Sequence, residues 1–287
     1  MQNTVDRKPL VVYHAGCSDG FAAAWCFWHF YKDSYEYFPG VYQGALPDIV
    51  DRDVYLVDFS FKRDKVELML QYAKSVTLLD HHASALTDLW DFAKFNNFNM
   101  EHCSLEKSGA RIAWDFIKQK EKHTKKVPRI LEHIEDRDLW KFKLEHTREI
   151  MAAVFSYDYT FETYEKLMSL GKTGLNQLYK EGVAIERKYQ KDLKGLAKQV
   201  VRMARIGGFD VPIANANGHF ASDLGNMLSH DVPFAAIYYD TAEFRNFSLR
   251  SQDTGLDVTE IAKKYGGGGH PRASGFKVPR DHELAQI

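Results

Sequence analysis

The chain has little of what marks a secreted or membrane protein. It contains three cysteines among 287 residues, a small and odd number that does not indicate a disulfide framework. No apolar run approaches the roughly 18 residues that a membrane-spanning helix needs. The first residues lack the basic-then-apolar order of a signal peptide. From these absences we predict a cytoplasmic protein without a membrane partner.

An excess of one charge is also missing. The chain has 38 Lys and Arg against 39 Asp and Glu, a formal net charge of −1. Proteins that coat long duplex DNA usually carry a basic surface. We therefore predict no long duplex partner, and a polyanionic substrate would have to be attracted by bound metal and a few placed cations. A homodimer stays an open alternative.

Apolar strand-like segments alternate with helix-like segments in the first part of the chain. The strand candidates are 10–14, 54–58 and 76–80, and the helix candidates are 20–31, 62–73, 108–119 and 129–140. Apolar strands that alternate with helices are typical of parallel sheets covered on both faces. This pattern predicts an α/β fold with a doubly wound, mostly parallel N-terminal sheet.

The second part of the chain begins a new pattern. A long charged stretch at 179–204 indicates a linking helix, and Gly207 and Gly208 follow it. Three further strand candidates come next: 211–216, 234–239 and an antiparallel strand at 244–250. Because one core rarely grows to this size, we predict two domains. They are residues 1–200, with the linking helix at the end, and a smaller α/β domain at 201–287, with a substrate cleft between them.

Each strand candidate of the first domain ends in ionisable residues. They are His14 and Asp19, then Asp58, then Asp80, His81 and His82. Because the carboxyl ends of parallel strands line one crevice, these groups should converge. Crowded carboxylates raise one another's pKa unless a cation is present, and imidazole with carboxylate suits transition metals. A metal site is therefore predicted, with helix capping by Asp58 and Asp80 as the alternative.

An acidic run, Glu135 to Asp138, closes one of the helical segments. Its carboxylates have two interpretations that the residues alone leave open. They are a further ligand for the metal site, or an exposed helix end with salt bridges.

The tail holds four consecutive glycines, 266–269, followed by His270 and Arg272. Glycines expose backbone N–H groups that can cradle a phosphate, and the two basic side chains add hydrogen-bond donors. A flexible linker is the alternative. Arg250, at the end of a strand candidate, is either a bidentate phosphate clamp or a surface arginine.

Together these segments resemble the DHH–DHHA1 phosphoesterase family, and within it the RecJ-related nanoRNases or oligoribonucleases. The matching segments follow the family's order over nearly the whole chain. They are HAGCSDGFAAA (14–24), VDFS (57–60), LLDHHAS (78–84), EDRD (135–138), SLRS (248–251) and GGGGHPRASGF (266–276).

The resemblance implies a DHH domain followed by a DHHA1 domain, and two divalent metal ions. Mn²⁺ is the usual ion, with Mg²⁺, Co²⁺ or Fe²⁺ as alternatives. The implied metal ligands are His14, Asp19, Asp58, His81 and Asp136. The implied catalytic residues are Asp58, Asp80, which would orient an imidazole, and His82. The implied substrate-binding residues are His82, Arg250, Gly267, Gly268, Gly269, His270 and Arg272.

One motif departs from the family. Many members have two aspartates in a D-x-D-G arrangement, whereas this chain has Cys17, Ser18, Asp19 and Gly20. A thiolate is a soft ligand where a hard one is usual. Cys17 is therefore a further candidate ligand, and the metal preference stays open.

The resemblance implies a metal-dependent phosphodiesterase that hydrolyses short oligonucleotides or linear dinucleotides to 5′-mononucleotides, with water activated by two metals. Related alternatives are a cyclic-dinucleotide phosphodiesterase, a nucleoside 3′,5′-bisphosphate phosphatase and a longer-strand single-strand exonuclease. A family-II pyrophosphatase would share only the first domain. An alternative of another class is a non-catalytic nucleic-acid-binding protein.

Overall fold

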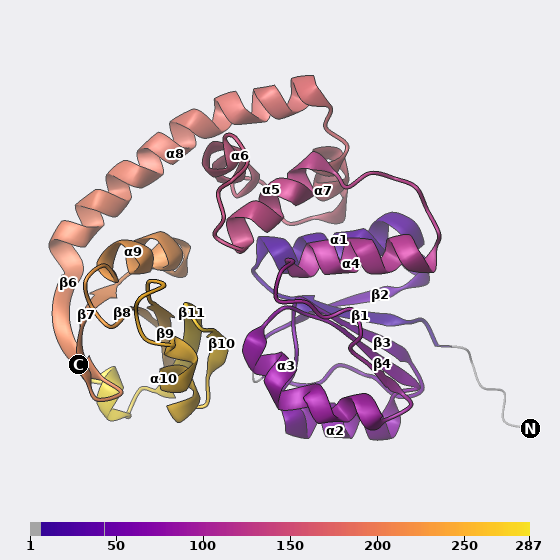
Figure 1. Ribbon diagram of the computed structural model, residues 1–287, viewed down its shortest axis with the longest axis horizontal. Helices are drawn as coiled ribbons and strands as arrows, with labels where there is room; N and C mark the ends of the chain where they lie inside the picture. The colour runs from indigo at the N-terminus through magenta and orange to yellow at the C-terminus, as the bar shows by residue number, and fades with distance from the viewer. Residues whose placement is uncertain (1–6, 43) are drawn as a thin grey trace, which may run out of the picture. The chain divides into compact units, whose positions relative to one another are not determined.

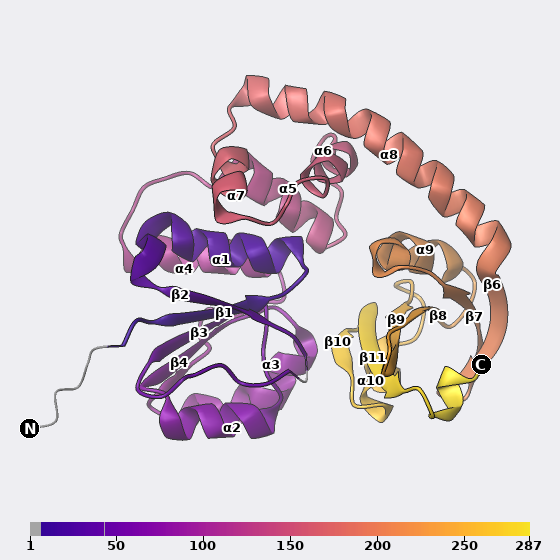
Figure 2. The ribbon, with the colours of Figure 1, turned by 180° about the vertical axis from the view of Figure 1, so that it is seen from behind.

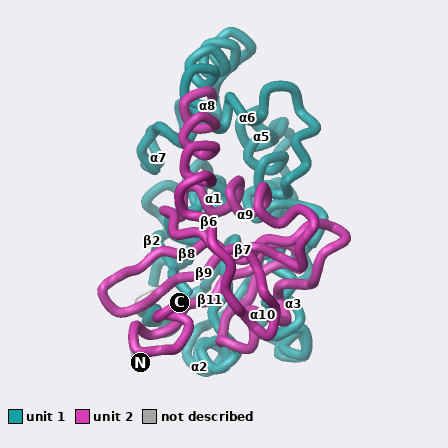
Figure 3. Tube along the Cα trace, turned by 90° about the vertical axis from the view of Figure 1, so that its left-hand side faces the viewer, with its two compact units in different colours: residues 1–186 teal, residues 187–287 magenta. Residues whose placement is uncertain are grey.

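The computed structural model describes residues 7–42 and 44–287 and divides into two compact units (Figure 3). The first unit runs to Glu186 and the second begins at Arg187. This division falls inside α8 (Lys172–Val200), so one continuous helix contributes to both units. The domain boundary predicted at residue 200 coincides with the end of that helix, and the assignment of all of α8 to the first domain stays a proposal.

The first unit is built on a sheet in which every strand pairing is parallel. Within the described residues the strand order is β2-β1-β3-β4-β5. The strands are β1 (Leu10–His14), β2 (Glu36–Gly40), β3 (Asp53–Val57), β4 (Ser75–Leu79) and β5 (Phe98–Asn99). The predicted doubly wound parallel α/β fold is confirmed.

Helices cover both faces of this sheet. α1 and α4 lie on one face, and α2 and α3 lie on the other (Figures 1 and 2). The helices are α1 (Ser18–Tyr31), α2 (Arg63–Tyr72), α3 (Ala83–Leu89), α4 (Gly109–Lys120), α5 (Arg129–Asp138), α6 (Thr147–Val154) and α7 (Phe161–Met168).

Successive strand residues pack into two separate hydrophobic cores, one on each face of the sheet. Val11 and Val57 belong to the core under α1 and α4, whereas Val12 and Leu56 belong to the core on the opposite face. Successive side chains of a strand point to opposite faces. A strand buried on both faces must therefore be apolar throughout, which accounts for the continuous apolar runs in the sequence.

The sequence pattern does not indicate the edge strand β2. Its sequence contains Pro39, which is compatible with a strand only at a sheet edge or a bulge, and β2 does lie at the edge. With β2 on one side of β1 and β3 on the other, the winding reverses between β1 and β3. In doubly wound sheets this switch point, at the carboxyl ends of the strands, is where ligands bind.

The second unit has a mixed sheet of its own. Within the described residues its order is β10-β11-β9-β8-β7-β6, and the β7–β8 pairing is parallel while the other pairings are antiparallel. Its elements are β6 (Val201–Ile206), β7 (Phe209–Asn215), α9 (Ala221–Leu228), β8 (Ala235–Asp240), β9 (Phe244–Arg250), α10 (Val258–Lys264), β10 (Gly268–His270) and β11 (Ala273–Pro279).

The predicted linking helix is too long at its C-terminal end. Residues 201–204 belong to β6, whose pairing with β7 starts at Val201. The β6–β7 hairpin turns at Gly207 and Gly208, both with positive φ, a backbone conformation that favours glycine. Cross-strand pairing therefore overrides the helical pattern in this stretch. Across the part of the chain that the structure describes, no helix combines the length and apolar character needed to span a bilayer.

Candidate metal centre

The imidazole of His81 lies among three carboxylates. Its Nε2 is 3.0 Å from Asp58 Oδ1, 3.5 Å from Asp138 Oδ2 and 4.0 Å from Asp19 Oδ2. His81 is 3% exposed. The four residues come from separate segments, which follow β4 and β3, end α5 and begin α1. The carboxyl edge of the sheet thus brings acids and an imidazole together from distant parts of the sequence.

Asp19 joins two helices. It lies in the first turn of α1, and its carboxylate accepts the N–H groups of Gly109 at 2.6 Å and Ala110 at 3.2 Å. Those N–H groups begin α4, and the partial positive charge of a helix N-terminus favours a carboxylate. Asp19 is therefore held in place from outside its own helix, a link that the sequence does not reveal.

Asp58 follows β3 in a left-handed backbone conformation, with φ of 52°. Its N–H donates to Leu79 O at 3.0 Å, which continues the pairing towards β4. A non-glycine residue in this conformation costs energy and is found where surrounding structure enforces it, commonly at functional sites. The carboxylate also lies 3.5 Å from His14 Nδ1, at the end of β1. Asp58 thus stands between two imidazoles.

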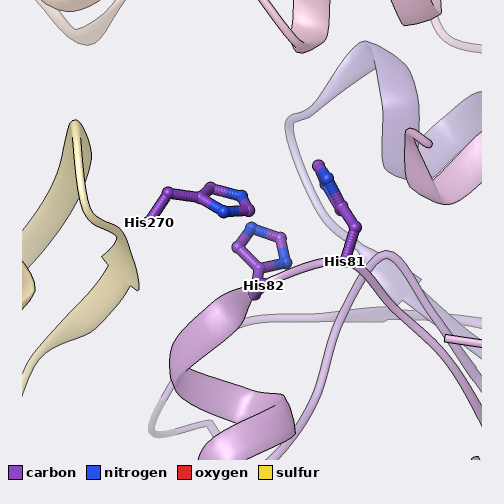
Figure 4. Close-up of side chains that lie close together, drawn as sticks. All are labelled: His81, His82 and His270. Atoms are coloured by element: carbon purple, nitrogen blue, oxygen red, sulfur yellow. The ribbon is translucent and has the colours of Figure 1, made fainter. Parts of the chain in front are cut away.

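Asp80 organises the segment between β4 and α3. Its Oδ1 accepts hydrogen bonds from the N–H of His81 at 2.8 Å and from His82 Nδ1 at 2.7 Å. In Figure 4 the rings of His81 and His82 lie next to each other, with centroids 4.7 Å apart; the figure also labels His270, from β10 of the second unit. Asp80 therefore orients the His82 ring rather than capping a helix.

The structure corrects one predicted ligand, because Asp138 and not Asp136 lies in the cluster. Asp136 instead accepts hydrogen bonds from the N–H groups of Lys143 and Leu144, at 2.8 and 3.1 Å, and from Thr147 Oγ1 at 2.6 Å. It thereby fixes the turn between α5 and α6. Residues two apart on a helix point roughly 200° apart, so the two aspartates cannot face one site.

The turn around Asp136 also holds a buried histidine. His133 Nδ1 lies 2.9 Å from Thr147 Oγ1. The threonine hydroxyl donates to Asp136, so the His133 ring donates from Nδ1 to the threonine oxygen. Burial lowers the pKa of His133 to about 4, whereas a histidine in an unfolded chain has a pKa of about 6.5.

This difference predicts acid sensitivity. As the pH falls, the histidine of the unfolded chain binds a proton before His133 of the folded chain does. The free energy of unfolding is therefore unaffected by His133 above pH ~6.5, and it falls by up to roughly 3 kcal/mol between pH ~6.5 and pH ~4. His133→Gln should flatten this dependence, measured as the free energy of urea unfolding at several pH values. The partly exposed His102 provides a control, since His102→Gln should keep the wild-type slope. Equal slopes in wild type and His133→Gln would contradict the assignment.

The carboxylates of the cluster disfavour one another's ionised forms. Burial, followed by the charges of Asp138 and Asp58, raises the pKa of Asp19 well above its usual range. Burial lowers the pKa of His81, but the surrounding acids outweigh it and raise the pKa to about 10. For Asp58 the directions are reversed. Burial raises its pKa, but the neighbouring imidazoles of His14 and His81 outweigh burial, and the pKa of Asp58 is lowered. The cluster thus has more carboxylates than positively charged side chains, and a divalent ion would supply positive charge that stabilises the ionised carboxylates.

Three sets of donor atoms within the described residues of the first unit are suited to hold an ion. In each set the donor atoms lie within 4.8 Å of one another. The sets are Asp19, His81 and Asp138; His14, Cys17 and Asp58; and Asp58, Asp80, His81 and His82.

Two side-chain atoms of residues in these sets support the fit to a cation. In the described structure His14 Nδ1 and Asp80 Oδ2 are buried and have no hydrogen-bond partner. Buried polar atoms are normally satisfied, and a metal ion would satisfy atoms of this kind. Carboxylate, imidazole and thiolate donors suit a divalent transition metal, so the residues fit the metal that the sequence predicts.

Comparisons with known proteins address both units. Residues 212–287 match the model of the DHHA1 domain. This part of the chain is a DHHA1 domain. The chain as a whole resembles the DHH–DHHA1 phosphoesterases, as its motifs predict.

Two relatives and one solved structure extend this comparison. An uncharacterized protein of Acanthamoeba polyphaga mimivirus is 28% identical over 94% of this chain and 68% of its own length. Oligoribonuclease NrnB of Bacillus subtilis strain 168 is 24% identical over 78% of this chain. This chain spans 59% of the length of NrnB. The solved structure is the DHH domain of a member of a ribosomal-protein family, with a TM-score of 0.59, 11% identity and coverage of 97% of this chain and 85% of that chain. This last likeness shows the fold alone.

The glycine run of the DHHA1 domain begins by closing a helix. The N–H of Gly266 donates to Lys263 O and that of Gly267 to Ala262 O, at 3.0 and 2.9 Å. These two N–H groups end α10 and do not form the predicted phosphate cradle. Residues 268–270 then form β10, paired with β11. The proposed contact with substrate is therefore narrowed to residues 268–270.

The two arginines of the DHHA1 domain that were predicted to bind phosphate differ in their surroundings. Arg250, at the end of β9, donates to Leu249 O at 2.8 Å and to Ser222 Oγ at 3.0 Å. Arg272 donates to three carbonyls of the 253–256 loop at 2.8 to 3.1 Å. This arrangement corrects the prediction for Arg272, whose guanidinium fastens the loop. Arg250 stays a candidate substrate contact.

One residue beside the cluster has no signal in the sequence. The ring of Tyr42 packs edge-on against the ring of His14, with centroids 5.1 Å apart, and lies 5.2 Å from the ring of Phe59. The residue is 47% exposed. An exposed aromatic ring next to a candidate metal ligand is a candidate surface for substrate.

Proposed function

We propose that the chain is a metal-dependent phosphodiesterase that hydrolyses very short RNAs or linear dinucleotides to 5′-mononucleotides. The observation that carries the proposal is the set of acids and imidazoles gathered around Asp58 at the carboxyl edge of the parallel sheet. Two further observations support this choice of substrate class. The same chain contains a match to the DHHA1 domain, and it is similar to oligoribonuclease NrnB.

We expect some residues of the site to bind metal and others to bind substrate. We expect two divalent ions, most simply two Mn²⁺. When bound, they would lower the pKa of a coordinated water and neutralise charge on the phosphoryl oxygens. Asp19, His81 and Asp138 form one donor set. Asp58 belongs to the two other sets of the first unit, and its Oδ1 lies 3.0 Å from His81 Nε2 of the first set. Asp58 is therefore the residue expected to serve both ions.

His82 is the group of the first unit that best suits a phosphate. Its Nδ1 donates to Asp80 Oδ1 at 2.7 Å, which turns Nε2 away from Asp80. Burial lowers the pKa of His82, but the Asp80 carboxylate outweighs it and raises the pKa. A ring protonated on both nitrogens can donate to a phosphoryl oxygen and stabilise the charge that develops there.

The near-neutral overall charge of the chain favours a short substrate. Affinity for a long nucleic acid grows with the number of phosphates neutralised by Lys and Arg, and this chain has a net charge of −1. A dinucleotide needs only one phosphodiester to be held at the metals. Tyr42 offers a ring on which a base could stack, a contact that binds any base.

The test is a digest of 5′-phosphorylated RNAs of increasing length with Mn²⁺, with products resolved by size. A linear dinucleotide, a cyclic dinucleotide and a nucleoside 3′,5′-bisphosphate complete the panel. We expect 5′-mononucleotides as products and the highest kcat/KM for the shortest RNAs. Asp58→Asn supplies the inactive control.

Other outcomes would replace the proposal. Fastest cleavage of long single strands, of the cyclic dinucleotide or of the bisphosphate would assign the corresponding alternative activity. Binding of RNA without cleavage of any substrate, under conditions in which Mn²⁺ binds, would favour a non-catalytic nucleic-acid-binding protein.

A further inference from the structure

The donor sets around Asp58 differ in chemistry. The set of Asp19, His81 and Asp138 offers carboxylates and one imidazole, whereas the set of His14, Cys17 and Asp58 includes a thiol. Hard oxygen donors suit Mn²⁺ and Mg²⁺, and a thiolate favours softer ions such as Zn²⁺. Two neighbouring positions in one site therefore have unlike preferences.

The backbone fixes the Cys17 sulfur beside the strand ends. Cys17 is the N-cap of α1, and its carbonyl accepts the N–H of Phe21 at 3.0 Å. The preceding Gly16 has a φ of +70°, which allows the tight turn between β1 and α1. The thiol is thus presented by the same turn that follows His14, and its place is set by the fold.

The other cysteines of the chain have structural surroundings. Cys26 lies 3.6 Å from the carbonyl of Ala110 and Cys103 lies 3.3 Å from that of Leu78, both with the thiol as donor. Neither belongs to a set of donor atoms that could hold an ion in the described residues. Cys17 alone combines with an imidazole and a carboxylate. The Nδ1 atom of His14, which lies 3.5 Å from Asp58 Oδ2, is buried without a hydrogen-bond partner.

We propose that His14, Cys17 and Asp58 bind a soft divalent ion such as Zn²⁺ or Co²⁺, while Asp19, His81 and Asp138 bind a hard one. The inference rests on the proposed function, in which this cluster holds two metals. The bond forms between the thiolate sulfur and the ion, and the thiol proton is released to solvent. The site is then a mixed-metal centre in which Asp58 serves two unlike ions.

The test is a titration of the intact protein with Co²⁺ without oxygen, followed by absorption. We expect a near-ultraviolet sulfur-to-cobalt charge-transfer band in the wild type that saturates with one ion per chain. Cys17→Ser should lose the band and weaken binding of that ion by at least ~10-fold. Cys103→Ser is the matched control and should keep the band. Cys17→Asp should lose the band while gaining Mn²⁺ affinity.

The outcomes separate this inference from the proposed function. Co²⁺ binding without the band, or a band that survives in Cys17→Ser, would overturn the soft site, and Mn²⁺-dependent hydrolysis would still stand. Failure of the wild type, folded by circular dichroism, to bind either Mn²⁺ or Co²⁺ would overturn the proposed function itself.

Discussion

Asp58→Asn should reduce kcat/KM for short RNA by ~10³-fold or more, since metal-ion stabilisation of the transition state supplies several kcal/mol. The carboxylate lies 3.0 Å from His81 Nε2 and 3.5 Å from His14 Nδ1, and it belongs to two of the donor sets. Asparagine keeps the size of the side chain but removes the charge that a cation requires. The measurement is hydrolysis at saturating Mn²⁺, together with thermal unfolding with and without Mn²⁺.

Thermal unfolding separates loss of metal from loss of fold. A ligand that binds the folded chain raises its unfolding temperature, so Mn²⁺ should stabilise the wild type and have little effect on Asp58→Asn. Asp64→Asn, an exposed acid on α2, should match the wild type in both assays. An Asp58→Asn protein that hydrolyses RNA at the wild-type rate would refute the role of Asp58.

Gly109→Ala should impair both activity and stability, although alanine usually strengthens a helix. A Cβ at this position would lie 2.4 Å from Asp58 Cβ and 2.8 Å from Asp58 Cα. The N–H of Gly109 also holds Asp19 at 2.6 Å. The methyl group would therefore push apart two candidate ligands. We expect a loss of about 1–3 kcal/mol in stability and at least ~10²-fold in kcat/KM.

Gly195→Ala is the control for this substitution. Gly195 lies in α8, and a Cβ there would meet nothing within 4 Å. That variant should be as active as the wild type and more stable by roughly 0.5–1 kcal/mol. Urea unfolding and kcat/KM would be measured for both variants. A Gly109→Ala protein with wild-type activity would show that the contact with Asp58 does not position the site.

The sequence predicts much of the first unit because two simple rules apply to it. Apolar runs covered on both faces predict β1 at its observed bounds, Leu10–His14, and the helix that follows. The rule that parallel strands end at one edge then places His14, Asp58 and His81 near one another, and the structure brings these three residues together.

The rest depends on features that a linear pattern does not contain. Asp136 and Asp138 are the same residue type. Which of them faces the site depends only on how α5 is rotated about its own axis. The N–H groups of Gly266 and Gly267 are used by α10, and the guanidinium of Arg272 by a neighbouring loop. Each of these depends on a tertiary partner, so residue type alone could not assign the role.

The most direct test of a metal site at the carboxyl edge of the sheet is an anomalous diffraction map from crystals soaked in Mn²⁺. We expect a peak in contact with the carboxylates of Asp58, Asp19 and Asp138. A well-ordered map with no peak within coordinating distance of Asp58 would contradict it.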